Sequence, residues 1–473
     1  MKSIGQQVWG VFLVAALIVP AAWAQRTNPI GPYYPIGADE ANVSSSKPGD
    51  EPTQDTTEPD TGPVGGANEI SLGRSERARN IFVPRINISQ RVETNLGSGG
   101  PNDLVGASDL SGQFELRRSW RSAEFSAEYG GGGQIYAENS ERNSSYHNLR
   151  LRQTFSGRRW SLMLGNEISF LPESPFSLRG SGGSLMTAVF DINGTVTTFN
   201  PIFIPGQSVI SGFTSRWSNA SVAQLQYKLG KRSSLFVAGG YGMLRFSDPQ
   251  FTDANQSNLI AGFERDLNGR NTLGVMYGLG RFRFPGQPNG INNHTVRLEF
   301  GRRLTNRMAV RIAGGPVFSM YADPLAGDSQ RIFWSLNSHL KYRIARMDLG
   351  VAYDHDLTGG SGVLAGAESD IIRLTLDRQI SRQWSLGVSG GYARNRGLQA
   401  FTTGPAQRIY NSEFGSVRMT RNLGREKSAF FTYSLSHQTS NLIGCSLPSC
   451  ENVGLRHTFE VGLAWHPRPL RID

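Results

Sequence analysis

The feature that most constrains the fold of this chain is a two-residue alternation of apolar and polar side chains, which begins near Ile81 and continues almost to the carboxyl end. In residues 273–280, Leu, Val, Tyr and Leu alternate with Gly, Met, Gly and Gly, and residues 347–354 and 458–465 repeat the pattern. Successive side chains of a β-strand point to opposite faces, whereas a helix repeats every 3.6 residues. The alternation therefore predicts strands with one apolar face, each about ten residues long.

Turn residues divide this region into about eighteen candidate strands, and the connections between them alternate in length. Short connections occur around residues 157, 231, 269, 306, 345, 382 and 425, and longer polar connections lie between them. Short turns at one end and longer loops at the other are typical of outer-membrane barrels. The predicted strands span 80–94, 110–120, 122–137, 146–156, 159–170, 215–229, 233–247, 256–267, 271–284, 293–304, 308–320, 331–344, 346–356, 367–380, 383–396, 409–422, 427–440 and 453–466.

The first 24 residues predict export from the cytoplasm. A basic second residue is followed by an apolar core at 8–19 and by Ala-Trp-Ala at 22–24, which places small residues at the cleavage positions. This is the pattern of a secretory signal peptide cut between Ala24 and Gln25, and the core is too short for a membrane anchor. Residues 25–78 are acidic and rich in Pro, Thr, Ser and Gly, so we expect a disordered periplasmic tail.

An exported chain with these strands is either a soluble secreted protein or a barrel that buries every second strand residue in lipid. The mean hydropathy of −0.33 does not separate the two. Aromatic residues do, because they lie toward segment ends on the apolar face, where rings suit a bilayer interface: Trp160, Tyr227, Tyr277, Tyr353, Trp384, Tyr392, Tyr433 and Trp465. A β-sandwich rarely combines so many strands with aromatic ends. We therefore predict an all-β, antiparallel transmembrane β-barrel at residues 79–466, with about eighteen strands (range about 16–20), followed by a short tail at 467–473.

With these features, residues 80–466 resemble the porin-like outer-membrane β-barrels of Gram-negative bacteria, in architecture rather than in a family motif. The resemblance implies a place in the outer membrane, both termini in the periplasm, contact with outer-membrane lipid and lipopolysaccharide, and insertion by the barrel-assembly machinery. Such barrels often end on an aromatic residue, whereas Trp465 is followed here by eight residues. We expect the strand that ends at Trp465 to be the one that the machinery recognises.

Charge is unevenly distributed along the chain. The formal net charge is +10, but residues 25–70 hold eight acids against two basic residues, so the chain from residue 71 onward carries +15. A basic protein can bind nucleic acid. For an exported chain we expect no nucleic acid, and lipopolysaccharide phosphates or an anionic solute are better candidate partners.

Cys445 and Cys450 are the two cysteines of the chain and lie in one stretch rich in Gly, Pro, Ser and Asn. In an oxidising compartment they are expected to form a small loop-closing disulfide. Zinc would need more ligands nearby, and a redox pair usually has the spacing Cys-x-x-Cys.

Charged residues on the polar faces are the candidate lining of a pore. The candidates for the lumen and its constriction are Arg150, Arg152, Glu167, Arg297, Glu299, Arg311, Lys341, Arg343, Arg373 and Asp377. Fixed positive charge raises the local concentration of anions, while inward acids such as Glu128 and Glu264 oppose it, so we predict a mild anion preference. The same side chains could instead neutralise one another across neighbouring strands and close the lumen.

The longest connection, residues 172–214, is the predicted constriction. Within it, residues 185–200 resemble a small hairpin around Asn193-Gly194, which would raise the number of strands to twenty if it joined the wall. The inward faces are also rich in glycine, at Gly240, Gly242, Gly274, Gly278, Gly280, Gly387 and Gly391. These glycines either leave room for solvent or a packed loop, or ease the curvature of the strands.

Catalytic chemistry has little support in the sequence. Asp354-His355-Asp356 could perform acid–base catalysis or bind a cation, but its place at a strand end favours an exposed loop start. The other histidines have no matching serine, and Gly130–Gly133 precedes no helix, which a phosphate loop requires. We expect no cofactor and no metal. The predicted function is a passive channel for small hydrophilic solutes; the alternatives are a closed structural or adhesive barrel whose outer loops bind a surface ligand and, third, a barrel enzyme.

Overall fold

The computed structural model describes residues 80–94, 104–137, 143–172, 189–190, 196–198, 214–286, 290–305, 307–323, 327–344, 346–360, 362–398, 408–441 and 455–472. The predicted signal peptide at 1–24, the predicted tail at 25–78 and the cysteine pair lie outside these residues. No helix in the described part of the chain is long and apolar enough to cross a membrane.

Eighteen long strands of the described chain form one antiparallel sheet. They are β1 (Ile81–Thr94), β2 (Leu104–Ser119), β3 (Ala123–Tyr136), β4 (Ser144–Ser156), β5 (Trp160–Leu171), β8 (Arg216–Lys228), β9 (Ser233–Phe246), β10 (Ala254–Asn268), β11 (Asn271–Arg283), β12 (Gly290–Thr305), β13 (Met308–Asp323), β14 (Gly327–Ile344), β15 (Met347–Thr358), β16 (Ala367–Gln379), β17 (Trp384–Gly397), β18 (Ile409–Asn422), β19 (Lys427–Ser440) and β20 (Arg456–Trp465).

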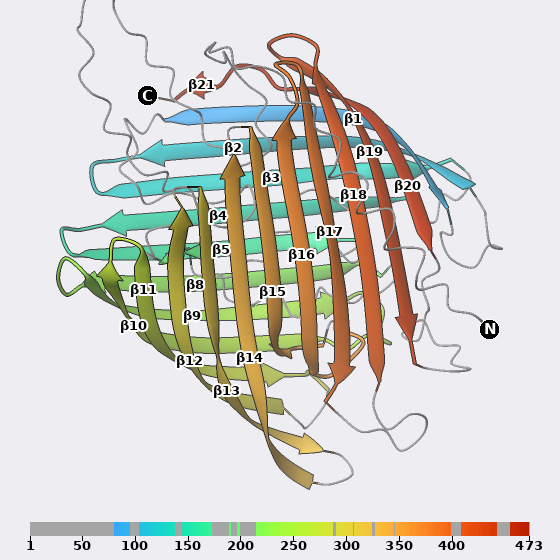
Figure 1. Ribbon diagram of the computed structural model, residues 1–473. Helices are drawn as coiled ribbons and strands as arrows, with labels where there is room; N and C mark the ends of the chain where they lie inside the picture. Colours follow the sequence, from blue (N-terminus) through green and yellow to red (C-terminus); the bar gives the residue numbers. More distant parts are fainter. Residues whose placement is uncertain are drawn as a thin grey trace, which may run out of the picture.

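The sheet closes on itself, because β1 pairs with β2 on one side and with β20 on the other. The closing register runs from Ile86 opposite Trp465 to Glu93 opposite Thr458. Figure 1 shows the two walls of the resulting barrel, with β14 to β19 crossing in front of β2 to β9. The prediction of an antiparallel barrel of about eighteen strands is confirmed.

Three short strands of the described chain are not among the eighteen. β6 (Val189–Phe190) and β7 (Val196–Thr198) form a separate antiparallel pair, so the predicted hairpin exists but does not join the wall. The residues after Trp465 return to the barrel, where β21 (Leu470–Arg471) pairs with the first two residues of β1.

Some strands extend beyond the range that alternation predicts. β2 begins at Leu104 instead of 110, and β14 begins at Gly327 instead of 331. Residues 327–330 contain no apolar residue, so no alternation could reveal this extension, yet their backbone continues the ladder with Met320–Asp323 of β13.

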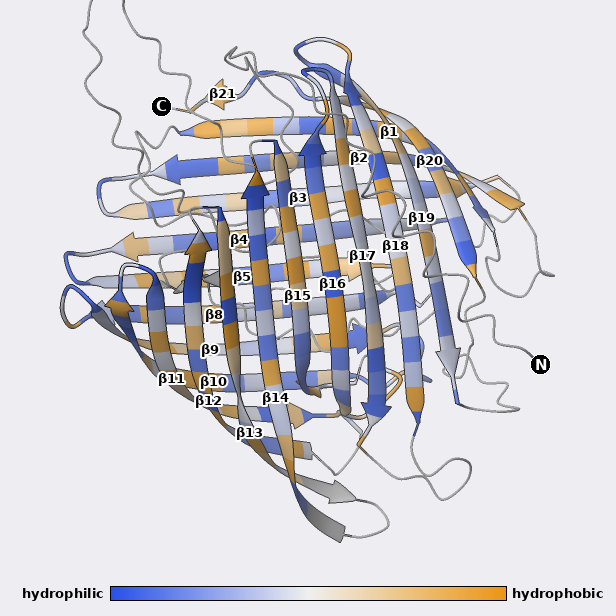
Figure 2. Cartoon of the chain, viewed as in Figure 1, coloured by the Kyte–Doolittle hydropathy of each residue, from blue (hydrophilic) through white to orange (hydrophobic). Residues whose placement is uncertain are grey.

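The two faces of the wall differ in polarity as the alternation predicts. Leu298 on β12 is 66% exposed on the outside, whereas the next residue, Glu299, is 1% exposed on the inside. Hydrophobic and hydrophilic residues alternate along β14 to β18 in Figure 2. An apolar outer face is compatible with lipid because the backbone polar groups are already paired within the closed sheet.

Aromatic rings form a continuous row across six neighbouring strands, from β1 to β8. The rings of Phe82, Phe114, Tyr129, His147, Phe170 and Trp217 follow one another with centroid distances of 5.8, 5.3, 6.3, 6.4 and 5.0 Å. Rings at such distances attract one another beyond the area that they bury. Contacts between these rings stabilise the register of β1 to β5 and β8, which come first in the chain.

The outward place of Leu298 gives a direct test of the membrane register. We expect Leu298→Arg to reduce the amount of folded protein in the membrane, because a lipid-facing arginine at mid-depth costs about 2–4 kcal/mol. Thr295→Arg adds the same side chain to the inner face of the same strand and should assemble like the wild type. The folded fraction can be measured as the heat-modifiable band of membrane extracts; equal losses in the two variants would contradict the register.

Candidate functional site

The inner face of the barrel is lined by polar side chains that bind one another across strands. Ser369 donates to the Oδ1 atom of Asn395 at 2.7 Å, and Ser412 donates to the Oε1 atom of Gln438 at 2.8 Å. Such bonds satisfy polar groups that are shielded from bulk water. Charged side chains on the same face form four groups, which together are the candidate functional site.

The Arg311 group joins three strands on the inner wall. The guanidinium of Arg311 on β13 lies 3.1 Å from the Oε1 atom of Glu264 on β10 and also contacts Glu299 on β12. The side chains of all three are at most 7% exposed. Gly274 lies between the two acids: an added Cβ would meet Glu264 Cγ at 3.4 Å and Glu299 Cβ at 3.5 Å. At this position glycine provides the space in which the two carboxylates pack around the arginine.

The Arg150 group has the same form on the other side of the barrel. Arg150 on β4 lies 3.2 Å from Glu128 on β3 and 3.4 Å from Glu167 on β5. Asn148 donates a further hydrogen bond to Glu167 at 3.1 Å. One arginine is thus held between two carboxylates, as in the Arg311 group.

The aspartates of β15 form the third group, and here the sequence interpretation was wrong. Asp354 and Asp356 do not begin an exposed loop; they are 6% and 9% exposed on the inner wall. Arg373 on β16 lies 3.4 Å from Asp354, and Arg297 on β12 forms an ion pair with Asp356 and donates to Ser335 Oγ at 2.8 Å. The strand was predicted to end at residue 356 and continues to Thr358, so both aspartates lie within it and not at the start of a loop.

His355 points the other way, because neighbouring residues of a strand face opposite sides. Its ring contacts Asp370 at 2.7 Å and lies 3.5 Å from Glu368, both on β16. Within the described residues, no group of three or more His, Cys, Asp or Glu side chains is placed to hold a metal ion.

The fourth group lies at the seam where the barrel closes. Glu93 on β1 is 1% exposed, and it contacts Arg91 and, at 2.6 Å, Arg456 on β20. Arg91 also donates to Gln134 on β3 at 3.1 Å. Sequence reasoning missed this group, because the partners are more than 360 residues apart and only the ring closure brings them together.

Four predicted lining residues are not assigned to these groups. Arg152 and Lys341 are on inner faces of β4 and β14. Arg343 pairs with Asp348 at 2.6 Å near the short-turn end, where both side chains are well exposed. Asp377 also lies near this end and is exposed.

Opposite charges are therefore matched along the inner wall. The four groups contain six arginines and seven carboxylates. Each guanidinium faces at least one carboxylate, so the fields of the two partners largely cancel beyond the distance between them. The wall also has an apolar patch, where Met163, Val222, Phe236 and Ala238 pack together beside the Arg311 group.

At the end of the barrel with the longer connections, the β15–β16 connection is described at residues 359–360 and 362–366. Gly360, Gly362 and Gly366 have φ values of +87°, +81° and +88°, which side chains other than glycine rarely adopt. They let the chain turn inward, with the Leu364 amide donating to the Gly360 carbonyl at 3.0 Å. The amide of Thr252, in the β9–β10 connection, donates to the Gly362 carbonyl at 2.6 Å.

This contact spans a considerable part of the ring. Five strands, β10 to β14, separate β9 from β15 along the wall. The β15–β16 connection is held there by apolar packing, because Val363 and Leu364 are buried against Phe251 and Tyr410, with Phe246 of β9 beside them. The connection therefore lies across the mouth at this end.

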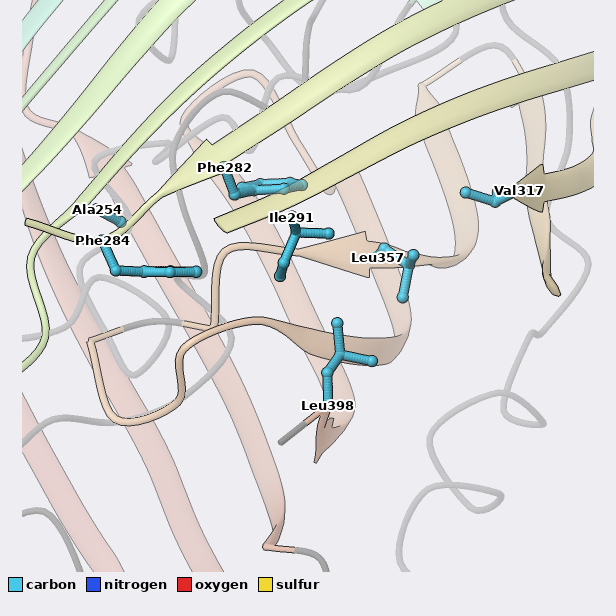
Figure 3. Close-up of a cluster of buried hydrophobic side chains, with 7 residues drawn as sticks. All are labelled: Ala254, Phe282, Phe284, Ile291, Val317, Leu357 and Leu398. Carbon is cyan, nitrogen blue, oxygen red and sulfur yellow. The ribbon is translucent and has the colours of Figure 1, made fainter. Parts of the chain in front are cut away.

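A second apolar cluster links the same parts of the wall. It contains Ala254, Phe282, Phe284, Ile291, Val317, Leu357 and Leu398, all at most 6% exposed. Figure 3 shows Phe282 and Ile291 directed toward Leu357 and Leu398, which come from a different stretch of the wall. Together the two clusters form an apolar collar around the β15–β16 connection.

Sequence reasoning placed the constriction elsewhere. Of the predicted segment 172–214, the structure describes only the β6–β7 pair and the segment ends, so that prediction lies mostly outside the described residues. The signal that could have found the described constriction is the run Gly-Gly-Ser-Gly at 359–362 with Gly366 after it. Three glycines at positive φ within eight residues indicate a connection with a defined series of turns.

Comparison with known proteins gave similarities only to solved structures. No protein-family model and no curated protein matches the sequence. Similar structures include Pseudomonas aeruginosa OccK2 (OpdF) in complex with glucuronate, with 10% identity over 83% of this chain and 98% of that chain and a TM-score of 0.40. Others are Acinetobacter baumannii OccAB3 (9%, 82%, 99% and 0.41) and the outer membrane protein OpdK of P. aeruginosa (9%, 82%, 98% and 0.39). The barrel described above is established by the strand pairing of this chain itself.

The burial of the Arg311 group leads to a stability prediction. Arg311→Leu removes the partner of two buried carboxylates, and breaking a buried pair in this way costs about 3–5 kcal/mol. We expect the folded gel band to convert to the unfolded one at a clearly lower temperature. Adding Glu264→Gln and Glu299→Gln should recover part of the loss. Arg346→Leu, in an exposed turn, serves as the control; a similar loss there would contradict the role assigned to the group.

The shape of the β15–β16 connection gives a second prediction. Gly362→Ala places a Cβ at positive φ against the ring of Phe246, so the connection should move away from β9. Gly286→Ala is the matched control, because Gly286 has a φ of +84° but open space at its Cβ position. We expect only Gly362→Ala to raise single-channel conductance in planar bilayers. The same conductance in both variants would show that this connection does not limit the flow of ions.

Proposed function

We propose that this chain is a porin-like outer-membrane channel through which small hydrophilic solutes cross passively. The observation that carries the proposal is a closed ring of eighteen strands that is apolar outside and polar inside. Barrels of sixteen to eighteen strands are too wide for wall side chains to fill, so an aqueous path remains inside. The proposal includes no enzymatic step.

The orientation that we propose follows from the connections. The ends of the chain's barrel, Ile81 and Trp465, lie at the end where the short turns are. In outer-membrane barrels the short turns face the periplasm and the longer loops face outward. On this basis the β15–β16 connection and its apolar collar would stand at the outer mouth. The barrel-assembly machinery would receive the chain on the periplasmic side, with β20 as the last spanning strand.

Permeation would depend on size first and on charge second. A solute entering from outside would pass the collar and then the paired charges of the inner wall. Because each described arginine group is matched by carboxylates, little net field remains to attract one sign of ion. We therefore propose weak selectivity, and a mild anion preference stays a prediction that depends on Lys341, Arg152 and the other basic residues of the inner face.

The decisive measurement is conductance of the purified, heat-modifiable barrel in a planar bilayer. We expect stable single-channel steps, and a reversal potential under a salt gradient that indicates a mild preference for anions. The physical reason is that fixed positive charge on the basic residues of the inner face raises the local concentration of anions. Strong cation selectivity would contradict the charge argument, and a folded barrel without conductance would contradict the channel itself.

One observation favours the alternative of a closed structural or adhesive barrel. The apolar collar and the strongly buried charges, such as Glu299 and Arg216 at 1% exposure, would leave little space for water if further segments filled the interior. In that case the barrel would conduct no ions even with the β15–β16 connection displaced. Gly362→Ala therefore distinguishes the two proposals. It should raise the conductance of a channel that the β15–β16 connection narrows, and a filled barrel should show no conductance with or without the substitution.

A further inference from the structure

The outer surface of the barrel has a small basic hollow at its short-turn end, between β10–β11 and β12. It is lined by Asn268, Gly269, Arg270, Asn271 and Arg302 and has a volume of about 400 Å³. Asn268, Gly269, Arg270 and Arg302 are exposed. The hollow therefore lies on the surface, next to the membrane-facing wall.

The turn that forms the hollow is fixed by its own hydrogen bonds. Asn268 Oδ1 accepts the backbone amides of Arg270 at 2.9 Å and of Asn271 at 2.8 Å. The carbonyl of Arg270 accepts the amide of Arg303 at 2.8 Å, which attaches the turn to β12. Arg270 and Arg302 are thus presented from a rigid frame, at two neighbouring positions of the rim.

These two arginines differ from those of the inner wall in having no acidic partner. Among the described residues, neither Arg270 nor Arg302 forms an ion pair, in contrast to the four inner groups. The nearest acid along the turn, Asp266, accepts a hydrogen bond from Thr272, which is buried on the inner face. Two guanidinium groups at one hollow without a carboxylate favour an anion with several oxygen atoms, such as a phosphate.

Apolar side chains lie directly beside the hollow on the same outer face. Asn271 pairs with Arg302 in the sheet, and two residues further into the membrane Leu273 pairs with Phe300. Leu273 is 46% exposed and Phe300 is 39% exposed. A ligand that fits both parts has a phosphate at one end and hydrocarbon at the other.

We infer that this hollow binds the headgroup phosphate of an anionic glycerophospholipid, with the acyl chains along Leu273 and Phe300. The choice of lipid depends on the orientation proposed above, because the short-turn end would lie in the periplasmic leaflet, which contains glycerophospholipids. Lipopolysaccharide would meet the barrel at the opposite end. The bound lipid would attach the rim of the barrel to its leaflet at one defined site.

The test uses the full chain, purified as a folded barrel in detergent and titrated with palmitoyl-oleoyl-phosphatidylglycerol, with bound lipid counted by native mass spectrometry. The wild type should show one saturable lipid adduct. The double variant Arg270→Gln and Arg302→Gln should bind it at least about tenfold more weakly, because hydrogen bonds to charged groups contribute on that scale. The double variant Arg158→Gln and Arg159→Gln removes two exposed arginines from another short turn and should bind like the wild type.

Two further lipids separate recognition of an anionic headgroup from general binding of lipid to the barrel. Phosphatidylcholine, which has a phosphate but no net charge, should bind more weakly than phosphatidylglycerol, and diacylglycerol, which has no phosphate, should form no adduct that depends on Arg270 and Arg302. Equal losses in the two double variants, or an adduct that neither variant changes, would overturn the inference. The heat-modifiable gel band controls for folding. Conductance should be unchanged in the Arg270 and Arg302 variant, so failure of the lipid site and failure of the channel can be told apart.

Discussion

The proposed place of the barrel in a membrane imposes one constraint on which the rest of the structure depends: a chain that crosses lipid must pair all of its backbone polar groups within itself. A sheet satisfies this only if it has no free edge, so β1 and β20, which are far apart in sequence, must meet. The buried ion pair between Glu93 and Arg456 lies across this seam and joins the first and last strands of the ring. Closure thus creates a polar contact that neither end of the chain could form alone.

Closure also determines the polarity of the side chain at each strand position. The outer side chains are apolar, as the proposed contact with lipid requires, and the inner side chains are polar and contact one another. Leu298 and Glu299 are adjacent in sequence and opposite in environment for this reason alone. Because the interior is partly shielded, charges there are stable only with partners, which explains why Arg311 and Arg150 each lie between two glutamates.

The sequence predicted the parts of the fold that repeat. Alternation located nearly all strands, since it reflects the same constraint at every position, and it assigned Arg297 and Arg311 to the polar face, where each contacts a carboxylate. It did not predict which charges pair, because the partner of Arg297 lies three strands away along the sheet and that of Glu93 lies across the seam where the barrel closes. It misread Asp354 and Asp356 because a polar strand end and an exposed loop have the same composition. The constriction was missed because its shape depends on backbone conformation at three glycines, not on periodicity.

The contrast between paired and unpaired arginines divides the molecule by function. Inside the barrel, each grouped arginine is held by carboxylates, which stabilises the wall and leaves a weak field along the proposed path. On the outer rim, Arg270 and Arg302 have no such partner among the described residues and face a hollow beside exposed leucine and phenylalanine side chains. Arginine therefore stabilises the wall where carboxylates surround it, and it is available to bind the proposed lipid phosphate where they do not. Pairing inside the barrel weakens the field that a solute would meet, so the excess of basic residues in the sequence as a whole predicts only a mild preference for anions.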